Sequence, residues 1–317
     1  MGKIAFIFPG QGSQAVGMGK ALADSNDAVA AIFKRADERL ETQLSKIIFE
    51  GPEEELTLTT NTQPALLTTS IAILEAFKEA GITADFVAGH SLGEYSALVA
   101  AEAISFEDAV YAVRKRGAFM EAAVPAGLGA MAAILGMERQ LLKEVTEEIS
   151  LKGHPVELAN LNCPGQIVIS GSKEGVAKAA EVAKEKGARR IIPLQVSGPF
   201  HSSLMKPAAE RLAEVLNSID IQDAKIPVIA NVCATAVTSG EAIKENLVQQ
   251  VFSPVLWEDT VNYLLNEGVD TFIEIGSGNV LSGLVKKIDR KVNVHAVNDG
   301  ETMVKTIESL KGGNASC

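Results

Sequence analysis

The chain has 317 residues, a length that allows one large domain or two ordinary ones. Hydrophobic residues make up 47% and charged residues 22%, so the chain can bury a full core, which excludes a disordered protein. Its 29 lysines and arginines against 40 acidic residues give a net charge of −11, and no basic block stands out. Because a nucleic-acid-binding protein normally carries a basic patch, that class is disfavoured.

The apolar stretches and the cysteines indicate the compartment. The run Ile4 to Phe8 is too short for the core of a signal peptide. No apolar stretch reaches the roughly 18–20 residues that a membrane span needs. Cys163, Cys233 and Cys317 are widely spaced without a C-x-x-C pair, which supports neither a disulfide framework nor a zinc site. We therefore expect a soluble protein of the reducing cytoplasm.

The first part of the chain alternates strand-like and helical segments. Ser105 and Asp108 form a capping box at the start of one helix, and Pro64 is expected in the first turn of another. The expected elements are a strand at 3–8, helices at 28–48 and 64–80, a strand at 84–89, and helices at 92–103 and 105–123. This alternation predicts an α/β fold with a mostly parallel sheet.

The pattern changes after residue 123. The next elements are a strand at 128–136, a helix at 138–151, strands at 156–162 and 166–170, a helix at 173–186 and a strand at 188–196. This βαββαβ order is the split-βαβ, or ferredoxin-like, arrangement. Strand–helix alternation then resumes, with a helix at 202–218, a strand at 228–232, helices at 243–251 and 257–267, and a strand at 271–275. We therefore predict a small domain, 124–197, inserted into a large α/β domain made of 1–123 and 198–317.

A serine stands on a sharp turn between a strand and a helix. Residues 89–93 read Gly-His-Ser-Leu-Gly and match the G-x-S-x-G pattern in that context. Gly89 and Gly93 have no side chains, so the strand and the helix can approach closely while Ser91 is held on a strained turn. The backbone N–H of Leu92, at the helix N-terminus, is the natural donor to an oxyanion. We predict that Ser91 is a nucleophile; the alternative is a structural serine.

A serine nucleophile needs a base, and four histidines are available. His201 directly precedes a helix, whose N-terminus disfavours the imidazolium and lowers the pKa of the side chain. We interpret His90 as a packing residue, His154 as solvated and His295 as a sheet position. His201 is therefore the predicted base, with a helix-capping role as the alternative. No acidic residue in 92–200 stands at an obvious orienting position, so the orienting group, acid or backbone carbonyl, stays open.

The helix after Ser105 carries an inward-facing charge. Its apolar stripe includes Val113 and Met120, and at about 100° per residue Arg116 falls within that stripe, beside Gly117. A buried guanidinium needs an anionic or hydrogen-bonding partner. Helical phase alone leaves two partners open, an internal Glu or Asp and a substrate carboxylate.

The turn after the first strand has two interpretations. Residues 10–15, Gly-Gln-Gly-Ser-Gln-Ala, formally fit the dinucleotide-binding pattern G-x-G-x-x-A. That interpretation needs a second strand ending in an acidic residue about 20 residues on, whereas residues 23–40 look helical. The alternative is a turn whose Gln11 amide reaches the serine site as a second oxyanion donor.

Motifs along nearly the whole chain carry a family resemblance. They are Phe8 to Gln14, Gly89 to Glu94, Arg116, Asn160 to Gln166, Phe200-His201, Gln250 and Pro254-Val255. In this order and spacing they strongly resemble the malonyl-CoA:acyl carrier protein transacylases, and the acyltransferase domains of polyketide and fatty acid synthases are similar. The resemblance implies a hydrolase-like large domain, a ferredoxin-like small domain, and an active site in the cleft between them.

The resemblance also implies a role for each matching residue. These roles are Ser91 as nucleophile, His201 as base, the backbone carbonyl of Gln250 as the group that orients His201, Gln11 and the Leu92 N–H as oxyanion hole, Arg116 as the holder of the malonyl carboxylate, Asn160 and Asn162 as cleft residues, and Phe200 as a residue favouring malonyl over methylmalonyl units. The implied reaction is ping-pong malonyl transfer from malonyl-CoA to acyl carrier protein in fatty acid or polyketide biosynthesis. It needs no cofactor, no nucleic acid and no membrane.

Two other functions share some of these residues. A serine esterase or thioesterase would have the same elbow, but it gives no reason for an inward Arg116. A non-catalytic scaffold would be expected to have lost Ser91 or His201, and both are present.

Basic residues are candidates for docking the partner. Acyl carrier proteins are acidic, and so is this chain, so a local basic patch has to overcome a long-range repulsion. Arg189 and Arg190 of the small domain, with Lys286 and Lys287 of the large one, are the candidates; the alternative is solvated surface charge.

Overall fold

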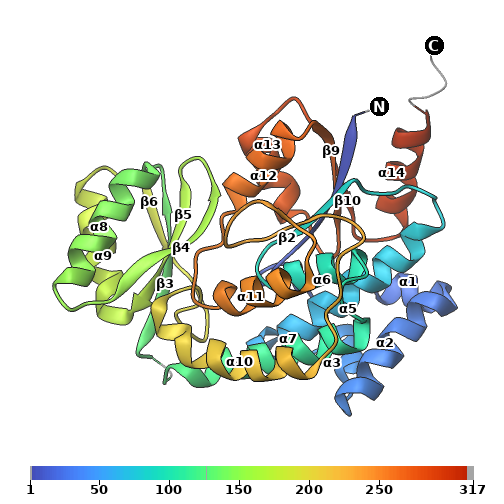
Figure 1. Ribbon diagram of the computed structural model, residues 1–317, viewed down its shortest axis with the longest axis horizontal. Helices are drawn as coiled ribbons and strands as arrows, with labels where there is room; N and C mark the ends of the chain where they lie inside the picture. Colours follow the sequence, from blue (N-terminus) through green and yellow to red (C-terminus); the bar gives the residue numbers. More distant parts are fainter. Residues whose placement is uncertain (1, 126, 313–317) are drawn as a thin grey trace.

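The computed structural model describes residues 2–125 and 127–312, which form two β-sheets flanked by helices (Figure 1). The larger sheet is mostly parallel and the smaller one is antiparallel, so the predicted α/β class is confirmed. Cys317 lies outside the described residues. No helix in the two described ranges has the length and apolarity needed to cross a membrane.

The larger sheet has the strand order β10-β9-β1-β2-β7-β8. Parallel pairing joins β10 to β9, β9 to β1, β1 to β2 and β2 to β7, while β8 pairs antiparallel with β7. The strands are β1 (Lys3–Phe8), β2 (Phe86–Gly89), β7 (Val228–Ile229), β8 (Ala236–Val237), β9 (Val269–Ile275) and β10 (Asn293–Val297). Strand β1 lies next to β2, so the turn after β1 lies beside the end of β2. Ser91 follows two residues after that end.

Helices cover both faces of this sheet. For this reason residues 4–8 of the central strand β1 are all apolar. Successive side chains of a strand point to opposite faces. Phe6 and Phe8 belong to one core, together with helices α2, α5, α6 and α7, whereas Ala5 and Ile7 belong to a second core with α12 and α13. These helices are α2 (Asp27–Leu40), α5 (Thr59–Lys78), α6 (Gly93–Ala100), α7 (Phe106–Ala123), α12 (Trp257–Asn266) and α13 (Val280–Ile288).

The smaller sheet has the order β4-β5-β3-β6, with antiparallel pairing throughout. Its elements are β3 (Gly129–Leu135), α8 (Arg139–Leu151), β4 (Val156–Cys163), β5 (Gln166–Ser172), α9 (Lys173–Glu185) and β6 (Arg190–Pro193), which confirms the βαββαβ order. Ala132 and Ile134 of β3 pack in one core with α8 and α9, whereas Met131 and Ala133 join the core of the larger sheet. The domain boundaries at 123/124 and 197/198 stay a prediction.

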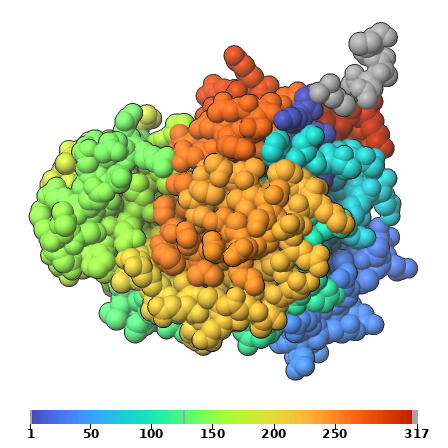
Figure 2. Space-filling view, viewed as in Figure 1, coloured from blue at the N-terminus to red at the C-terminus, as the bar shows by residue number. Residues whose placement is uncertain are grey.

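The two sheets are joined by a segment that lies far along the chain. The N–H of Val255 donates to the Ala159 carbonyl at 2.9 Å, and the Leu161 N–H donates to the Val255 carbonyl at 2.9 Å. Val255 therefore forms an isolated parallel bridge with Asn160 of the edge strand β4. In Figure 2 the orange region that includes residues 250–256 borders the green region of the smaller sheet.

The helix expected at 28–48 is two helices. Helix α2 ends at Leu40 and α3 (Leu44–Glu50) begins four residues later, because Glu41 adopts a left-handed backbone conformation with φ 51°. The Asp37 side chain accepts the Ser45 N–H at 2.8 Å and fixes the corner between them.

Helix α5 begins earlier than its proline suggests. Thr59, and not a residue next to Pro64, starts the helix. Proline has no N–H to donate to the carbonyl four residues before it. That carbonyl, of Thr60, instead accepts a hydrogen bond from Arg114 Nη1 at 3.0 Å, so α7 supplies the donor that the proline lacks.

The remaining helices are short or lie at the edges of the fold. They are α1 (Lys20–Ser25), α4 (Glu53–Thr57), η1 (Ser203–Met205), α10 (Lys206–Ser218), α11 (Gly240–Gln250) and α14 (Gly300–Gly312). The sequence pattern did not predict α1, α4, α13 or α14, and the helix expected from residue 202 opens with the 3₁₀ turn η1.

Candidate active site

The serine elbow predicted from the sequence is present. Ser91 lies between the end of β2 and the start of α6 and has φ 53°, a left-handed conformation that costs a non-glycine residue energy. A Cβ on Gly89 would lie 1.9 Å from the Gly93 carbonyl oxygen, and a Cβ on Gly93 would lie 2.2 Å from the Phe8 carbonyl oxygen. Both glycines are therefore required by the close approach of strand, turn and helix.

Ser91 meets His201 although the two residues are 110 positions apart. Ser91 Oγ lies 2.8 Å from His201 Nε2. The other ring nitrogen, Nδ1, lies 2.8 Å from the Gln250 carbonyl oxygen and 3.2 Å from that of Ser253. Because both carbonyls can only accept, Nδ1 carries the hydrogen and Nε2 is free to accept the proton of Ser91. Backbone carbonyls, and no carboxylate within the described chain, thus orient this histidine.

His201 is held in its neutral form. Burial lowers its pKa to about 3, and the Arg116 cation acts in the same direction. The sequence pattern predicts a lowered pKa for His201 through a nearby helix N-terminus. That cause is wrong, because helix α10 begins only at Lys206, after the turn η1.

Arg116 is the buried charge predicted from helical phase, with 1% of its surface exposed. It donates to Gln63 Oε1 at 2.9 Å, to Gln250 Oε1 at 2.9 Å and to Ser91 Oγ at 3.1 Å. These acceptors are two neutral amides and a hydroxyl. Among the described residues no carboxylate forms an ion pair with Arg116, so the alternative of an internal Glu or Asp partner is not what the fold provides.

A small cavity of about 110 Å³ lies over Ser91 and Arg116. Asn160 lines it, as expected for a cleft residue, and so do Gln11 and Phe200. Met120, Met131, Leu194 and Val196 supply its apolar walls. The two catalytic candidates therefore open onto a mostly apolar space that contains one buried cation.

Asn162 does not line the cavity over Ser91 but a neighbouring one. Its Oδ1 is 2.9 Å from His90 Nε2, and it lines a neighbouring cavity of about 240 Å³. This outer cavity shares Gln11, His90 and Asn160 with the inner one, and Val280 at the start of α13 forms part of its opposite side. The two cavities are therefore neighbours that share part of their walls.

The two predicted oxyanion donors lie beside Ser91. Gln11 lines the inner cavity, and its Nε2 donates to Thr59 Oγ1 at 3.2 Å, which fixes the amide. In the described part of the chain the Leu92 N–H donates to no protein acceptor, which leaves it available at the start of α6.

Three further polar residues surround the dyad and were not predicted as site residues. Gln63 holds Arg116 from α5, while Glu94 and Asn231 lie buried behind the Ser91 turn. Glu94 directly follows Gly93 of the serine turn, so its position close to the site could have been predicted from the sequence. Asn231 comes from a loop 140 residues away, and no local pattern marks it.

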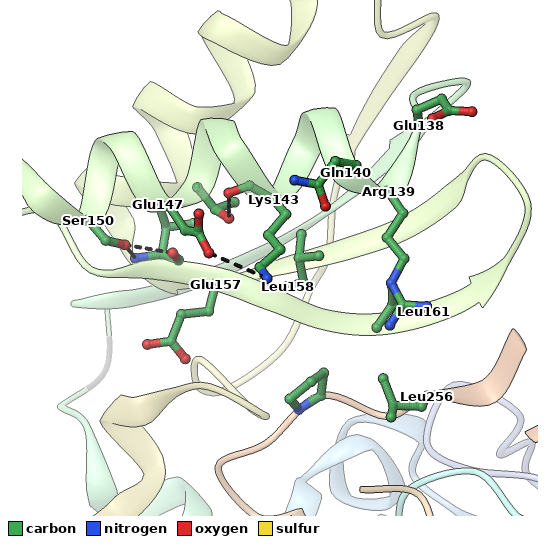
Figure 3. Close-up of a pocket in the computed structure, with 13 residues that line it drawn as sticks. Glu138, Arg139, Gln140, Lys143, Glu147, Ser150, Glu157, Leu158, Leu161 and Leu256 are labelled. Carbon is green, nitrogen blue, oxygen red and sulfur yellow. Dashed lines mark hydrogen bonds and ion pairs between the residues drawn. The ribbon is translucent and has the colours of Figure 1, made fainter. Parts of the chain in front are cut away.

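A larger cleft, of about 780 Å³, lies elsewhere. Figure 3 shows it between helix α8, strand β4 and the loop at Leu256. Its rim carries charges of both signs, including Arg139, Lys143 and Glu157, and Ser91 is not among its lining residues. Ser91 and His201 line the smaller cavity instead.

An α/β fold in which a serine elbow meets a histidine oriented by carbonyls defines a serine-dependent acyl-transfer enzyme, a class that includes both transferases and hydrolases. The sequence family described as the acyl transferase domain matches residues 5–303. This chain belongs to that family and is an acyltransferase.

Individual relatives extend over the full chain. A malonyl CoA-acyl carrier protein transacylase of Bacillus subtilis is 64% identical, with 99% of each chain covered. One from Staphylococcus aureus is 48% identical over the same share. Among solved structures, the transacylase of Clostridium perfringens is 44% identical with a TM-score of 0.95 and covers 99% of this chain and 98% of its own. A malonyl-transacylase in complex with a type II PKS acyl-carrier protein is 43% identical with a TM-score of 0.94, covering 97% and 99%.

Proposed function

We propose that this chain transfers a malonyl group from malonyl-CoA to the phosphopantetheine thiol of an acyl carrier protein, in fatty acid or polyketide biosynthesis. The observation that carries the proposal is the contact between Arg116 and Ser91: a buried cation that forms no ion pair with any carboxylate of the described residues lies beside the nucleophile. The acyl group of malonyl-CoA has three carbons and ends in a free carboxylate. That carboxylate can bind the Arg116 cation while the thioester carbonyl lies at Ser91 Oγ. The names of the relatives, which specify malonyl-CoA and acyl carrier protein, support the same substrates.

The first half-reaction loads the serine. Ser91 gives its proton to His201 Nε2 as Oγ attacks the thioester carbonyl, and the negative charge develops on the carbonyl oxygen. We assign the oxyanion hole to the Leu92 N–H and the Gln11 amide, because both residues line the cavity over Ser91. The C–S bond then breaks, the coenzyme A sulfur takes the proton from His201, and a malonyl ester remains on Ser91.

The second half-reaction reverses these roles. The phosphopantetheine thiol of the carrier gives its proton to His201 and attacks the malonyl ester, and Ser91 leaves with that proton. Each half-reaction exchanges a thioester and an ester, so the proposed chemistry requires no metal or redox cofactor. The outer cavity, which shares part of its walls with the inner one, is where we place the pantetheine arm of both substrates.

Arg116 also separates this function from hydrolysis by a serine esterase or thioesterase. An acetyl group would leave the cation without a carboxylate partner, whereas malonyl satisfies it. The direct test is mass spectrometry after incubation with malonyl-CoA alone. We expect one malonyl adduct on Ser91 in the wild type and none in Ser91→Ala. Rapid release of free malonate without carrier protein, in place of a stable adduct, would assign the chain to the hydrolases instead.

The cysteines indicate the compartment of the protein. We propose a cytoplasmic location, because Cys163 and Cys233 are free thiols and the sequence carries no pattern of paired cysteines. We propose neither a nucleic-acid partner nor a membrane partner, in keeping with the net charge of −11.

A further inference from the structure

Two buried polar side chains next to the dyad have no part in the mechanism above. Glu94 of α6 is 2% exposed and Asn231, in the loop after β7, is 0% exposed. Neither lines the cavity over Ser91, so neither reaches a bound acyl group. A buried carboxylate and a buried amide are costly unless their hydrogen bonds are satisfied. Their partners therefore show what they hold in place.

Asn231 holds the serine turn with both polar ends of its side chain. Its Oδ1 accepts the Ser91 N–H at 2.7 Å, and its Nδ2 donates to the Gly89 carbonyl at 2.7 Å. These two bonds clamp the turn on either side of His90. The backbone of Asn231 also accepts the N–H of Leu256 at 3.0 Å. Asn231 thus ties the Ser91 turn to the segment that borders His201.

Glu94 connects Asn231 to Gln250. A single oxygen, Oε2, accepts the Asn231 N–H at 3.0 Å and the Gln250 Nε2 at 2.7 Å. The same Gln250 Nε2 lies 3.0 Å from the Ser91 carbonyl, while the Gln250 carbonyl accepts from His201. One continuous set of hydrogen bonds therefore runs from the nucleophile, through Glu94, to the group that orients the base.

We infer that Glu94 and Asn231 are positioning residues, which hold the strained Ser91 turn and the Gln250 segment at the separation that proton transfer needs. A non-glycine residue with φ 53° persists only where its surroundings fix it. His201, with φ 58°, is in the same situation. The turn alone cannot define the distance of 2.8 Å between Ser91 and His201, because the two residues belong to separate segments of the chain.

The role assigned to Glu94 is that of a hydrogen-bond acceptor. A glutamine at this position keeps an acceptor oxygen of the same reach, whereas a methionine keeps the volume and loses the acceptor. A positioning role therefore predicts rescue by Glu94→Gln and not by Glu94→Met. A role in filling space predicts that both variants behave alike.

The inference rests on the proposed function for its choice of substrate, so the experiment uses two readouts. The first is the rate at which phenylmethylsulfonyl fluoride, a serine-directed reagent, labels Ser91, followed by mass spectrometry. The second is kcat and KM for malonyl transfer from malonyl-CoA to acyl carrier protein. The first does not depend on the natural substrate.

We expect Glu94→Met and Asn231→Ala each to lower the labelling rate and kcat by about 100-fold, the effect of a displacement near 1 Å in an active site. KM for malonyl-CoA stays within about threefold, because neither side chain touches the substrate. Glu94→Gln recovers labelling and kcat to within about fivefold of the wild type. Should Glu94→Met fail to fold, Asn231→Ala and Glu94→Gln give the same comparison.

Glu274 supplies a matched control. It is also 0% exposed, and its carboxylate accepts the N–H groups of Leu281 at 3.1 Å and Ser282 at 2.7 Å, away from the dyad. Glu274→Gln is expected to leave the labelling rate of Ser91 unchanged. Folded Glu94→Met with wild-type labelling, or Glu94→Gln as impaired as Glu94→Met, would overturn the inference. Wild-type protein that is labelled by the reagent but never malonylated would overturn the proposed function alone.

Discussion

Arg116 Nη2 lies 3.1 Å from Ser91 Oγ, so a buried cation contacts the hydroxyl that His201 also contacts. Arg116 has two further neutral partners, from Gln63 and Gln250, which fix the direction of the guanidinium. The cation therefore serves two purposes. Together with burial, which is the larger cause, it lowers the pKa of His201 and keeps the base neutral, and it offers an anionic substrate a binding partner beside the nucleophile.

Replacing Arg116 with alanine is expected to remove the preference for malonyl-CoA over acetyl-CoA. A hydrogen bond to a charged group contributes about 1.5–3 kcal/mol, so the ratio of kcat/KM values falls about 10- to 100-fold. Initial rates of Ser91 acylation with the two thioesters measure it. Arg114→Ala is the control, because Arg114 lies on the same helix but donates to Thr60 and Asn61, away from the cavity. Selectivity that survives in Arg116→Ala would remove the residue from substrate recognition.

The pH dependence of kcat/KM reports the state of His201. Its pKa, lowered to about 3 from the usual 6.5, means that the base stays neutral down to mildly acidic pH, and activity falls only as the imidazolium forms below that range. We expect no loss of activity that titrates near pH 6.5 and belongs to this histidine.

Glu94 supplies the necessary control for that profile. Burial raises the pKa of its carboxyl to about 7, so its own titration falls where an ordinary histidine would titrate. Glu94→Gln has no carboxyl to titrate. If kcat/KM of Glu94→Gln still declines below pH 6.5 with the slope of a single proton, His201 titrates there and the geometry does not keep it neutral.

Gly89 is expected to tolerate no side chain. A Cβ would lie 1.9 Å from the Gly93 carbonyl oxygen and 2.4 Å from the Glu94 nitrogen, so strand and helix have to separate. Gly89→Ala is expected to lower the free energy of unfolding by about 1–3 kcal/mol and to reduce kcat, because the Ser91 turn moves. Urea denaturation and malonyl transfer measure the two effects.

Gly283 is the matched control for that substitution. It lies in helix α13, and a Cβ there would meet no atom within 4 Å. Gly283→Ala is expected to stabilise the helix by up to about 1 kcal/mol and to leave kcat unchanged. Equal effects of the two substitutions would contradict the packing argument.

Basic residues of the smaller sheet and of α13 are expected to bind the carrier protein. Arg189 and Arg190 are exposed, and Lys287 Nζ donates to Gln166 Oε1 at 2.9 Å, which places Lys287 at the rim of the outer cavity. The double variant Arg189→Glu/Arg190→Glu is expected to raise KM for the carrier about 3- to 10-fold, with KM for malonyl-CoA unchanged.

The control for charge is a double reversal elsewhere. Lys34 of α2 and Lys46 of α3 are exposed, and these helices lie away from the smaller sheet in Figure 1. Lys34→Glu/Lys46→Glu changes the net charge by the same amount. If it raises KM for the carrier equally, overall repulsion and not a docking patch governs the interaction.

Local patterns in the sequence were sufficient for much of the fold and for the two reacting groups. The apolar run of β1, the capping residue Ser105 of α7 and the glycines at 89 and 93 each act over a few neighbouring residues, so the sequence displays them directly. The phase of α7 placed Arg116 inward for the same reason. Pro64 misled because the donor that replaces its missing N–H comes from Arg114, on another helix.

The order of the amino acids is enough to specify which side chains the site has: a serine on a tight turn, a histidine, an inward arginine and an amide after the first strand. How these side chains cooperate depends on the packing of the whole fold. The carbonyls that orient His201, the amides that hold Arg116, and the Asn231 that clamps Ser91 all come from segments remote in the chain. Hydrogen bonds between such segments leave no periodic signal in the sequence, because backbone carbonyls are the same at every residue and contacts between segments exist only once both sheets have packed.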